Sequence, residues 1–263
     1  MLDLSEPSRS PPHAYVWSAL REEGARAAAC EPELAGLISA AVLAHHNLGV
    51  ALARRLAGKL DDQEVGALVL LDVIERAYNT EPSIVQSAAC DLLAAVDRDP
   101  ACQGFLKPFL FYKGYQALQT YRVAHWLWRS GRRALAHHLQ SRASALFHVD
   151  IHPAAQIGRG VFVDHGTEII IGETVKIGDD VSILQGVTLG GNGVEAKPRH
   201  PTIGVGVSLL AGAKVLGDVA IGDYAKVGAG SLVLRDVPAG CTAVGVPARL
   251  VNCPSQEVED VPR

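Results

Sequence analysis

Two residue pairs in the C-terminal half carry groups that could perform acid–base chemistry: Asp164–His165 and Arg199–His200. Histidine exchanges protons near neutral pH, because its unperturbed pKa is about 6.5. A carboxylate can orient a histidine ring, and an arginine can bind a substrate carboxylate through two parallel hydrogen bonds. Each pair, taken by itself, is also consistent with an exposed surface loop. The pattern around the pairs favours a functional interpretation.

The pairs interrupt a six-residue repeat that runs from Ile151 to Val251. An aliphatic residue returns at every sixth position in three series, often followed by glycine. The series are Ile151, Ile157, Val163 and Ile169; Ile171, Ile177, Ile183 and Leu189; and Ile203, Leu209, Val215, Ile221, Val227 and Val233. A period of six fits neither an isolated amphipathic helix nor a plain strand. It is typical of a hexapeptide parallel β-helix, whose stacked coils share one continuous core.

The repeat is broken at two places, and each break contains one of the pairs. The step after Val163 is lengthened to eight residues and contains Asp164–His165. The step after Leu189 is lengthened to fourteen and contains Arg199–His200. A solenoid accommodates insertions as loops on its faces, and such loops often carry function. We therefore expect the regular coils to be a frame and the two breaks to carry the chemistry.

The N-terminal half has helical periodicity instead. One predicted helix opens at Thr80 and Pro82 and stops at Asp99–Pro100, with Asp91 beside its apolar stripe. A preceding helix is expected to be capped by Asp61 and Glu64, with Val65, Leu68, Val69 and Val73 as its apolar stripe. The stretch from Phe109 to Phe147 is also helical, with a break at Gly131.

The period changes from 3.6 to six near residue 145, where Pro153 prevents continuation of a helix. We expect an α+β protein in which an all-helical N-terminal domain precedes a parallel β-helix. The expected segments are a disordered N-terminus (1–12), a helical domain (13–145), a β-helix (146–251) and a flexible tail (252–263).

Composition argues against several functional classes. The formal net charge of −4 gives no electrostatic reason to expect nucleic-acid binding. No apolar run approaches the roughly 20 residues that span a bilayer, and the N-terminus lacks a signal-peptide pattern, so we expect no membrane association and a cytoplasmic location. The five cysteines are scattered and never form a C-x-x-C pair, which argues against a disulfide framework and a zinc site.

Several strings together resemble the serine O-acetyltransferase family, whose members begin cysteine synthesis. They are D-R-D-P-A (97–101), Y-R-V-A-H-W-L-W (121–128), V-D-I-H-P-A-A-Q-I-G-R-G (149–160), V-D-H-G-T-E (163–168), I-G-E-T (171–174), S-I-L-Q-G-V-T-L-G-G (182–191), R-H-P (199–201), G-A-K-V-L-G (212–217) and G-V-P-A-R (245–249). The resemblance covers nearly the whole chain. It implies a left-handed β-helix, homotrimers built through the β-helices, and pairing of trimers into hexamers through the helical domains.

The resemblance also implies a reaction, the transfer of acetyl from acetyl-CoA to the hydroxyl of L-serine. An alcohol needs a positioned base to become a nucleophile at neutral pH. His165 matches the family's base, and Asp150, fifteen residues earlier, is its implied partner carboxylate. His200 would lie beside the substrate and assist the tetrahedral intermediate. No metal is expected.

Further residues are assigned by the resemblance to binding. Asp164 and Asp91 would hold the serine ammonium group and Arg199 its carboxylate, while Glu173 is a further site residue with a structural role as the alternative. The pantetheine arm of acetyl-CoA would pass small residues in a groove between neighbouring β-helices. The implied cofactor-binding positions are Gly191, Ala211 and Ala229, with Lys226 and Arg249 meeting phosphates or remaining solvated surface charges.

Other interpretations remain open on the sequence. A hexapeptide acetyltransferase acting on homoserine, a sugar or an antibiotic would share the repeat. A γ-type carbonic anhydrase needs a close histidine pair, which His152, His165 and His200 do not provide. A non-enzymatic scaffold would leave the two breaks without chemistry. The resemblance further implies inhibition by L-cysteine and a complex with O-acetylserine sulfhydrylase through a terminal isoleucine. This chain departs from that last pattern because it ends at Arg263.

Overall fold

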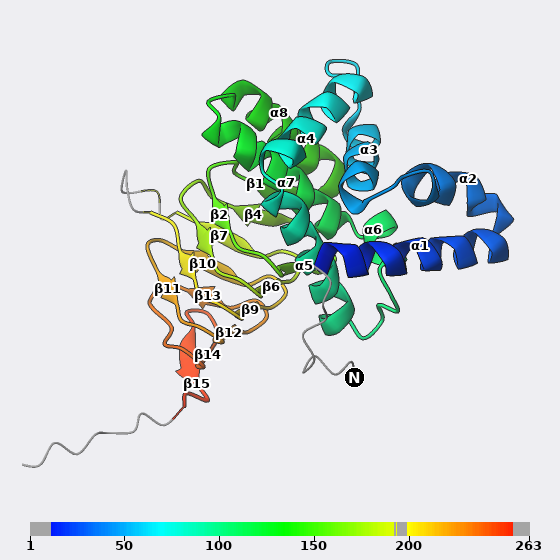
Figure 1. Ribbon diagram of the computed structural model, residues 1–263. Helices are drawn as coiled ribbons and strands as arrows, with labels where there is room; N and C mark the ends of the chain where they lie inside the picture. Colours follow the sequence, from blue (N-terminus) through cyan, green and yellow to red (C-terminus); the bar gives the residue numbers. More distant parts are fainter. Residues whose placement is uncertain (1–11, 192, 194–198, 255–263) are drawn as a thin grey trace, which may run out of the picture.

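A computed structural model describes residues 12–191, 193 and 199–254 of the chain, and the predicted segments 1–12 and 252–263 lie largely outside them. A helical domain comes first (Figure 1). Its elements are α1 (Pro12–Cys30), the 3-10 turn η1 (Pro32–Leu34), α2 (Ala35–Ile38), the π-helical turn η2 (Ser39–Leu43), α3 (Leu48–Leu60), α4 (Ala67–Thr80), α5 (Ser83–Arg98), α6 (Leu106–Phe111), α7 (Lys113–Arg129) and α8 (Arg133–Phe147).

Short strands then wind into a parallel β-helix. They are β1 (Val149–Ile151), β2 (Gln156–Ile157), β3 (Phe162–Val163), β4 (Ile169–Ile171), β5 (Lys176–Ile177), β6 (Ser182–Ile183), β7 (Thr188–Gly190), β8 (Thr202–Ile203), β9 (Ser208–Leu209), β10 (Lys214–Leu216), β11 (Ala220–Ile221), β12 (Lys226–Val227), β13 (Leu232–Val233), β14 (Thr242–Val244) and β15 (Arg249–Val251). Up to β13, every third strand joins the same face. The sheets are ordered β1-β4-β7-β10-β13, β2-β5-β8-β11 and β3-β6-β9-β12-β14-β15, and β15 is antiparallel to β14.

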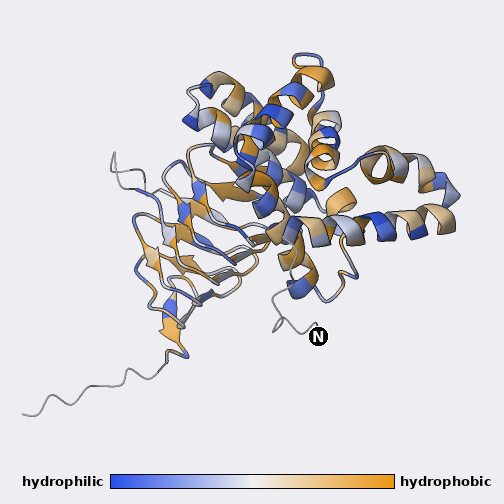
Figure 2. Cartoon of the chain, in the orientation of Figure 1, coloured by the Kyte–Doolittle hydropathy of each residue, from blue (hydrophilic) through white to orange (hydrophobic). Residues whose placement is uncertain are grey.

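The predicted six-residue period is confirmed by the strand register. Ile151 pairs with Ile171, which pairs with Leu189 on the next coil, and the same stacking continues on the other two faces. These aliphatic side chains are buried inside the coils. Figure 2 shows many hydrophobic residues along the strands. Each coil therefore buries its neighbour's apolar edge, as expected for a solenoid.

The helical domain packs on the first coil of the β-helix. Helices α5 and α7 contact β3, and α7 and α8 contact β1 (Figure 1). Helix α7 is buried along most of its length, which explains its many aromatic residues. The predicted break at Gly131 is confirmed, with a φ of 79° between α7 and α8. Helix α8 ends at Phe147 and β1 starts at Val149, close to the expected change of period at residue 145.

The predicted apolar stripe of α4 is wrong in register. Leu68 and Val69 are 82% and 57% exposed, whereas Leu70, Val73 and Ile74 are buried. The helix starts at Ala67, later than the Asp61–Glu64 signal suggests, because Asp61 caps it from a distance by accepting the backbone N–H of Ala67. A shift in the helix start rotates which side chains face the bundle.

The expectation of no disulfide is also wrong. Cys241, at a turn of the last coil, is bonded to Cys253, which follows β15, with Cα atoms 4.1 Å apart. The antiparallel return of β15 along β14 brings together two cysteines that are 12 residues apart. Cysteine spacing alone could not show this return. Within the described residues, no helix is long and apolar enough to cross a membrane.

Candidate functional site

The first break forms a corner between β3 and β4. Asp164 is anchored there because its backbone N–H donates to the Ile183 carbonyl, and Gly166 continues the turn with a φ of 70°. His165 has a φ of 55°, a left-handed conformation that is uncommon for a non-glycine residue. This turn points its side chain outward, 70% exposed, with Nε2 3.7 Å from Asp164 Oδ2. The corner therefore presents a histidine and a carboxylate to solvent.

The start of α7 supports this corner from the helical domain. Lys113 Nζ donates to Thr167 Oγ1 at 2.5 Å. A Cβ at Gly114 would overlap the Val163 carbonyl oxygen, so glycine is needed for the close approach of α7 to β3. The histidine corner is thus held between the first coil and a rigid helix.

Asp99, at the end of α5, is the carboxylate that the helical domain brings near His165. Its Oδ2 accepts from the Tyr112 hydroxyl at 2.6 Å, and its Oδ1 accepts from the Ala101 N–H at 2.8 Å. The Tyr112 hydrogen bond, with smaller effects from Lys107 and His165, lowers the pKa of Asp99 below its usual range. Asp99 is therefore held as an anion where the helical domain meets the first coil.

Asp91 lies elsewhere than the sequence suggested, because it is 1% exposed inside the helical domain. Arg122 donates to both of its carboxylate oxygens at 2.8–3.0 Å, with further donation from Gln119 Nε2 and the Val161 N–H. Arg122 also donates to the Gly158 carbonyl. All this bonding leaves Asp91 enclosed between α5, α7 and the first coil, with no exposure to a substrate.

The second break forms a different corner, between β7 and β8. Arg199 donates to Glu173 Oε2 at 2.7 Å, and His200 Nδ1 lies 2.7 Å from Thr174 Oγ1. Burial, with a smaller effect of Arg199, lowers the pKa of His200, which favours the neutral ring at pH 7. A Cβ at Gly172 would overlap the His200 ring, so this glycine makes room for it. Three predicted site residues are therefore brought together here: Glu173, Arg199 and His200.

Asp150 is not brought to His165 within one chain. It lies on β1, where its Oδ1 accepts from Gln140 Nε2 of α8 at 2.7 Å. Among the described residues, the only carboxylate within 4.0 Å of the His165 ring is Asp164. Stacking of coils places Asp150 beside Ile170 and not beside the corner, because the break adds residues that leave the regular register.

The corners of successive coils stack into edges of the β-helix. Ala211 and Ala229, two of the small residues expected near pantetheine, lie on the same edge as His165. A ladder of hydrogen bonds descends this edge, from Gly186 N–H to the Thr167 carbonyl, from Gly212 N–H to Gln185, and from Gly230 N–H to Ala211. Ala211 is half-buried and Ala229 is exposed along it. Gly191 lies instead on the Arg199 edge, where a Cβ would be 3.1 Å from the Arg199 carbonyl oxygen.

The two cations expected at phosphates are exposed on a third surface. Lys226 on β12 and Arg249 on β15 belong to the same sheet, on either side of β14. Their sheet also contains β3, the strand that leads into the His165 corner. This position is compatible with a ligand that runs along that edge.

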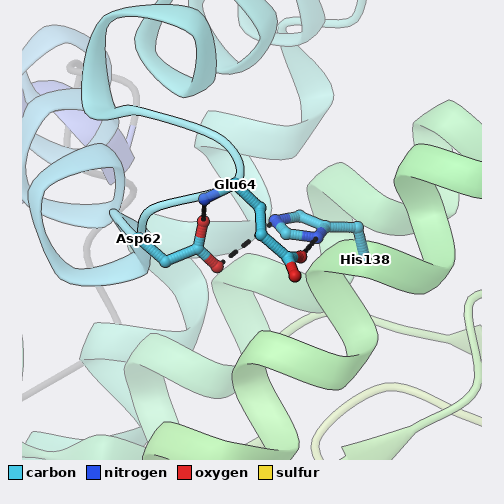
Figure 3. A group of neighbouring side chains, drawn as sticks. All are labelled: Asp62, Glu64 and His138. Atoms are coloured by element: carbon cyan, nitrogen blue, oxygen red, sulfur yellow. Dashed lines mark hydrogen bonds and ion pairs between the residues drawn. The ribbon is translucent and has the colours of Figure 1, made fainter.

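One group of described side chains has metal-ligand composition, namely Asp62, Glu64 and His138 (Figure 3). Asp62 Oδ1 already accepts from the backbone N–H groups of Glu64 and Val65, and Oδ2 lies 3.0 Å from Arg142 Nε. The two His138 nitrogens each face a different carboxylate, at 3.8 and 3.9 Å. We interpret the group as an ion-paired loop that fastens α8, since Arg142 supplies the positive charge.

Sequence reasoning missed Asp99 and Tyr112. A signal for Asp99 was present, because it is the second aspartate of the D-R-D-P-A string used for the family resemblance. No signal identified Tyr112, whose role depends on the junction between α6 and α7. Asp91, the helical-domain aspartate that the resemblance assigned to the ammonium group, is buried instead.

The fold and the two corners define the chain as a hexapeptide-repeat β-helix protein with a helical N-terminal domain. The family model described as "Serine acetyltransferase, N-terminal" matches residues 16–120. The serine acetyltransferase of Salmonella typhimurium is 51% identical over 242 residues, covering 92% of this chain and 89% of that protein. The chain therefore belongs to the serine acetyltransferase family.

Solved structures share both domains. A soybean serine acetyltransferase complexed with serine has a TM-score of 0.89 at 47% identity, covering 94% of this chain and 100% of that one. A serine acetyltransferase in complex with CoA has a TM-score of 0.88 at 49% identity, covering 91% and 100%. The similarity to these structures confirms the predicted fold, a helical domain followed by a left-handed parallel β-helix.

Proposed function

We propose that the chain transfers the acetyl group of acetyl-CoA to the hydroxyl of L-serine, giving O-acetyl-L-serine and CoA as the first step of cysteine synthesis. The observation that carries the proposal is the exposed corner that pairs His165 with Asp164, with the carboxylate Asp99 held nearby by Tyr112, whose ring packs on Phe162 of β3. A base with one anion beside it and a second nearby suits an acceptor that has both a hydroxyl and an ammonium group. Family membership supports the same assignment.

The proposed mechanism starts at the His165 ring. The ring accepts the serine hydroxyl proton while the oxygen attacks the thioester carbon, which forms a tetrahedral intermediate. Collapse of the intermediate breaks the carbon–sulfur bond, and the imidazolium returns the proton to the departing thiolate. Asp150 stays in the proposal as the predicted partner of the imidazolium, and it would have to exchange its bond to Gln140 for one to His165.

Substrate recognition follows from charge. Asp99 and Asp164 would bind the serine ammonium group, and Asp99 replaces the enclosed Asp91 in this role. Arg199 would bind the serine carboxylate after exchanging Glu173 for the substrate. His200, held neutral by burial, would lie beside the reacting atoms.

We infer that the complete site lies between neighbouring chains. Asp164–His165 occupies the corner between β3 and β4, whereas Arg199–His200 occupies the corner between β7 and β8, which lies on another edge of the β-helix and in a later coil. A threefold arrangement of β-helices would set one edge of each chain against the other edge of its neighbour. Acetyl-CoA would then run along the Ala211–Ala229 edge, opposite Gly191, toward Lys226 and Arg249. We propose a homotrimer of this kind, or a dimer of such trimers paired through the helical domains, as the resemblance implies.

Replacing Arg199 with alanine is expected to raise the KM for L-serine about 10- to 150-fold, because hydrogen bonds to a charged group are worth roughly 1.5–3 kcal/mol. The KM for acetyl-CoA should change little. Arg235→Ala is the matched control, since Arg235 is exposed on the same edge two coils further along. Steady-state kinetics with each substrate varied in turn measures both values. Equal KM values for serine in the two variants would contradict the assignment.

Other parts of the proposal follow from the same groups. L-cysteine keeps the ammonium and carboxylate groups of L-serine, so it should compete at this site and inhibit. A relative has been solved in complex with cysteine. We propose a cytoplasmic enzyme without a metal requirement.

The acceptor is tested by comparing L-serine with homoserine, a sugar and an aminoglycoside antibiotic in an assay of CoA release. The proposal expects L-serine to have the highest kcat/KM. Homoserine carries its hydroxyl one carbon further from the charges that Asp99, Asp164 and Arg199 would bind, which misplaces it at His165. A higher kcat/KM for any other acceptor would favour the alternative of a different hexapeptide acetyltransferase.

A further inference from the structure

The short segment from Tyr112 to Gly114 connects the two halves of the ammonium site. Tyr112 bonds Asp99, Lys113 bonds Thr167 in the loop that carries His165, and Gly114 packs against Val163 and Gly166. Three consecutive residues therefore contact both the carboxylate of the helical domain and the histidine corner. Because they are the junction of α6 and the first turn of α7, their spacing is fixed by a helix.

The half-buried Tyr112 side chain is held at its ring by packing and at its hydroxyl by the bond to Asp99. Its ring packs with Ala94, Ala95 and Phe162, the residue that begins β3. Lys107 Nζ lies 5.4 Å from the ring centroid. Burial and the bond to Asp99 raise the pKa of Tyr112, so the hydroxyl remains a hydrogen-bond donor at any physiological pH. The ring cannot shift without disturbing Phe162, and the hydroxyl therefore has a fixed place.

We propose that Tyr112 is a positioning residue that holds the Asp99 carboxylate where it meets the acceptor's ammonium group. The inference rests on the proposed function, since it concerns recognition of the amino-acid acceptor. One face of the carboxylate is bound by the Tyr112 hydroxyl at 2.6 Å and the Ala101 N–H at 2.8 Å. These two donors fix its plane and leave its remaining lone pairs directed elsewhere for a ligand. Tyr112 itself need not touch the substrate.

The charged groups around Asp99 agree with this role. Lys107 of α6 and His165 after β3 both act on its carboxylate, and the neutral Tyr112 and Cys102 side chains complete its surroundings. Without the tyrosine hydroxyl, the carboxylate could turn toward Lys107. Such a turn would keep the charge but move it away from the histidine corner. The expected consequence is weaker binding of an ammonium group, with the reaction step little altered.

The test is Tyr112→Phe in the full chain, which removes the hydroxyl and keeps the ring on Phe162. The KM for L-serine should rise about 10-fold, since hydrogen bonds to charged groups are the stronger class. The kcat and the KM for acetyl-CoA should stay within twofold. In an Asp99→Asn background, the same change should alter the KM for L-serine less than twofold, because Tyr112 acts through Asp99.

Tyr115→Phe is the matched control. Tyr115 lies on α7, and its buried hydroxyl donates to the Ala88 carbonyl of α5. It is not hydrogen-bonded to Asp99. This variant should keep the KM for L-serine of the unaltered chain. A serine KM within twofold in Tyr112→Phe, or equal rises in both KM values together with a lower Tm, would overturn the inference. No turnover of L-serine by the unaltered chain would instead overturn the proposed function and this inference with it.

Discussion

Replacing His165 with asparagine is expected to lower kcat for acetyl transfer to L-serine by about 10²–10⁴-fold, the usual contribution of a general base. Asparagine is chosen because it tolerates the left-handed backbone that His165 adopts, at a φ of 55°, better than alanine does. It can donate and accept hydrogen bonds but cannot take a proton at neutral pH. The effect therefore reports the loss of the base and not the loss of the turn.

The KM for acetyl-CoA and the Tm of this variant should remain close to those of the unaltered chain, because the His165 side chain is largely exposed. His46→Asn serves as the control, since His46 is an exposed histidine in the helical domain. Steady-state rates and thermal unfolding of both variants make the comparison. Full activity of His165→Asn would contradict the mechanism and would point to another base, such as His200.

Replacing Asp91 with alanine is expected to lower the free energy of unfolding by about 3–5 kcal/mol, because Arg122 would be left as a buried charge without its partner. The Val161 N–H and Gln119 would lose an acceptor in the same step. A change of this size is a large fraction of the stability of a typical domain. Chemical denaturation at a fixed protein concentration measures it.

The double variant Asp91→Leu/Arg122→Met should lose less stability than Asp91→Ala, since removing both charges avoids the unpaired buried cation. Asp72→Ala is the surface comparison. Asp72 pairs with Arg76 one helical turn away, with both side chains more than half exposed, so its loss should cost less than about 0.5 kcal/mol. If Asp91→Ala were as stable as Asp72→Ala, the buried pair would not hold the domains together as described.

The β-helix could be predicted closely from the sequence because its six-residue period is set by local burial. Each aliphatic of the repeat occupies the column that its position in the coil requires. The two corners were also predictable, because an insertion into such a repeat has to leave the column. His165 and Arg199 were predicted as site residues because they lie where the six-residue repeat is interrupted.

The features that were predicted wrongly depend on contacts between segments that are distant in the sequence. Asp91 was expected beside an apolar stripe, but Arg122 of α7 satisfies its charge in the interior, and no periodicity reports such a partner. The start of α4 was misplaced because Asp61 caps it from six residues away. The bond between Cys241 and Cys253 depends on the return of β15 along β14. Sequence spacing describes local geometry, and these features are set by tertiary packing.

A crystal structure of the full chain with L-serine bound tests the central claim most directly. We expect the serine ammonium group within hydrogen-bonding distance of Asp99 and Asp164, and the serine carboxylate hydrogen-bonded to Arg199. We also expect the serine hydroxyl beside His165 Nε2, with Asp91 still bonded to Arg122. Serine bound away from the corner between β3 and β4, or with its ammonium group out of reach of Asp99, would contradict the account.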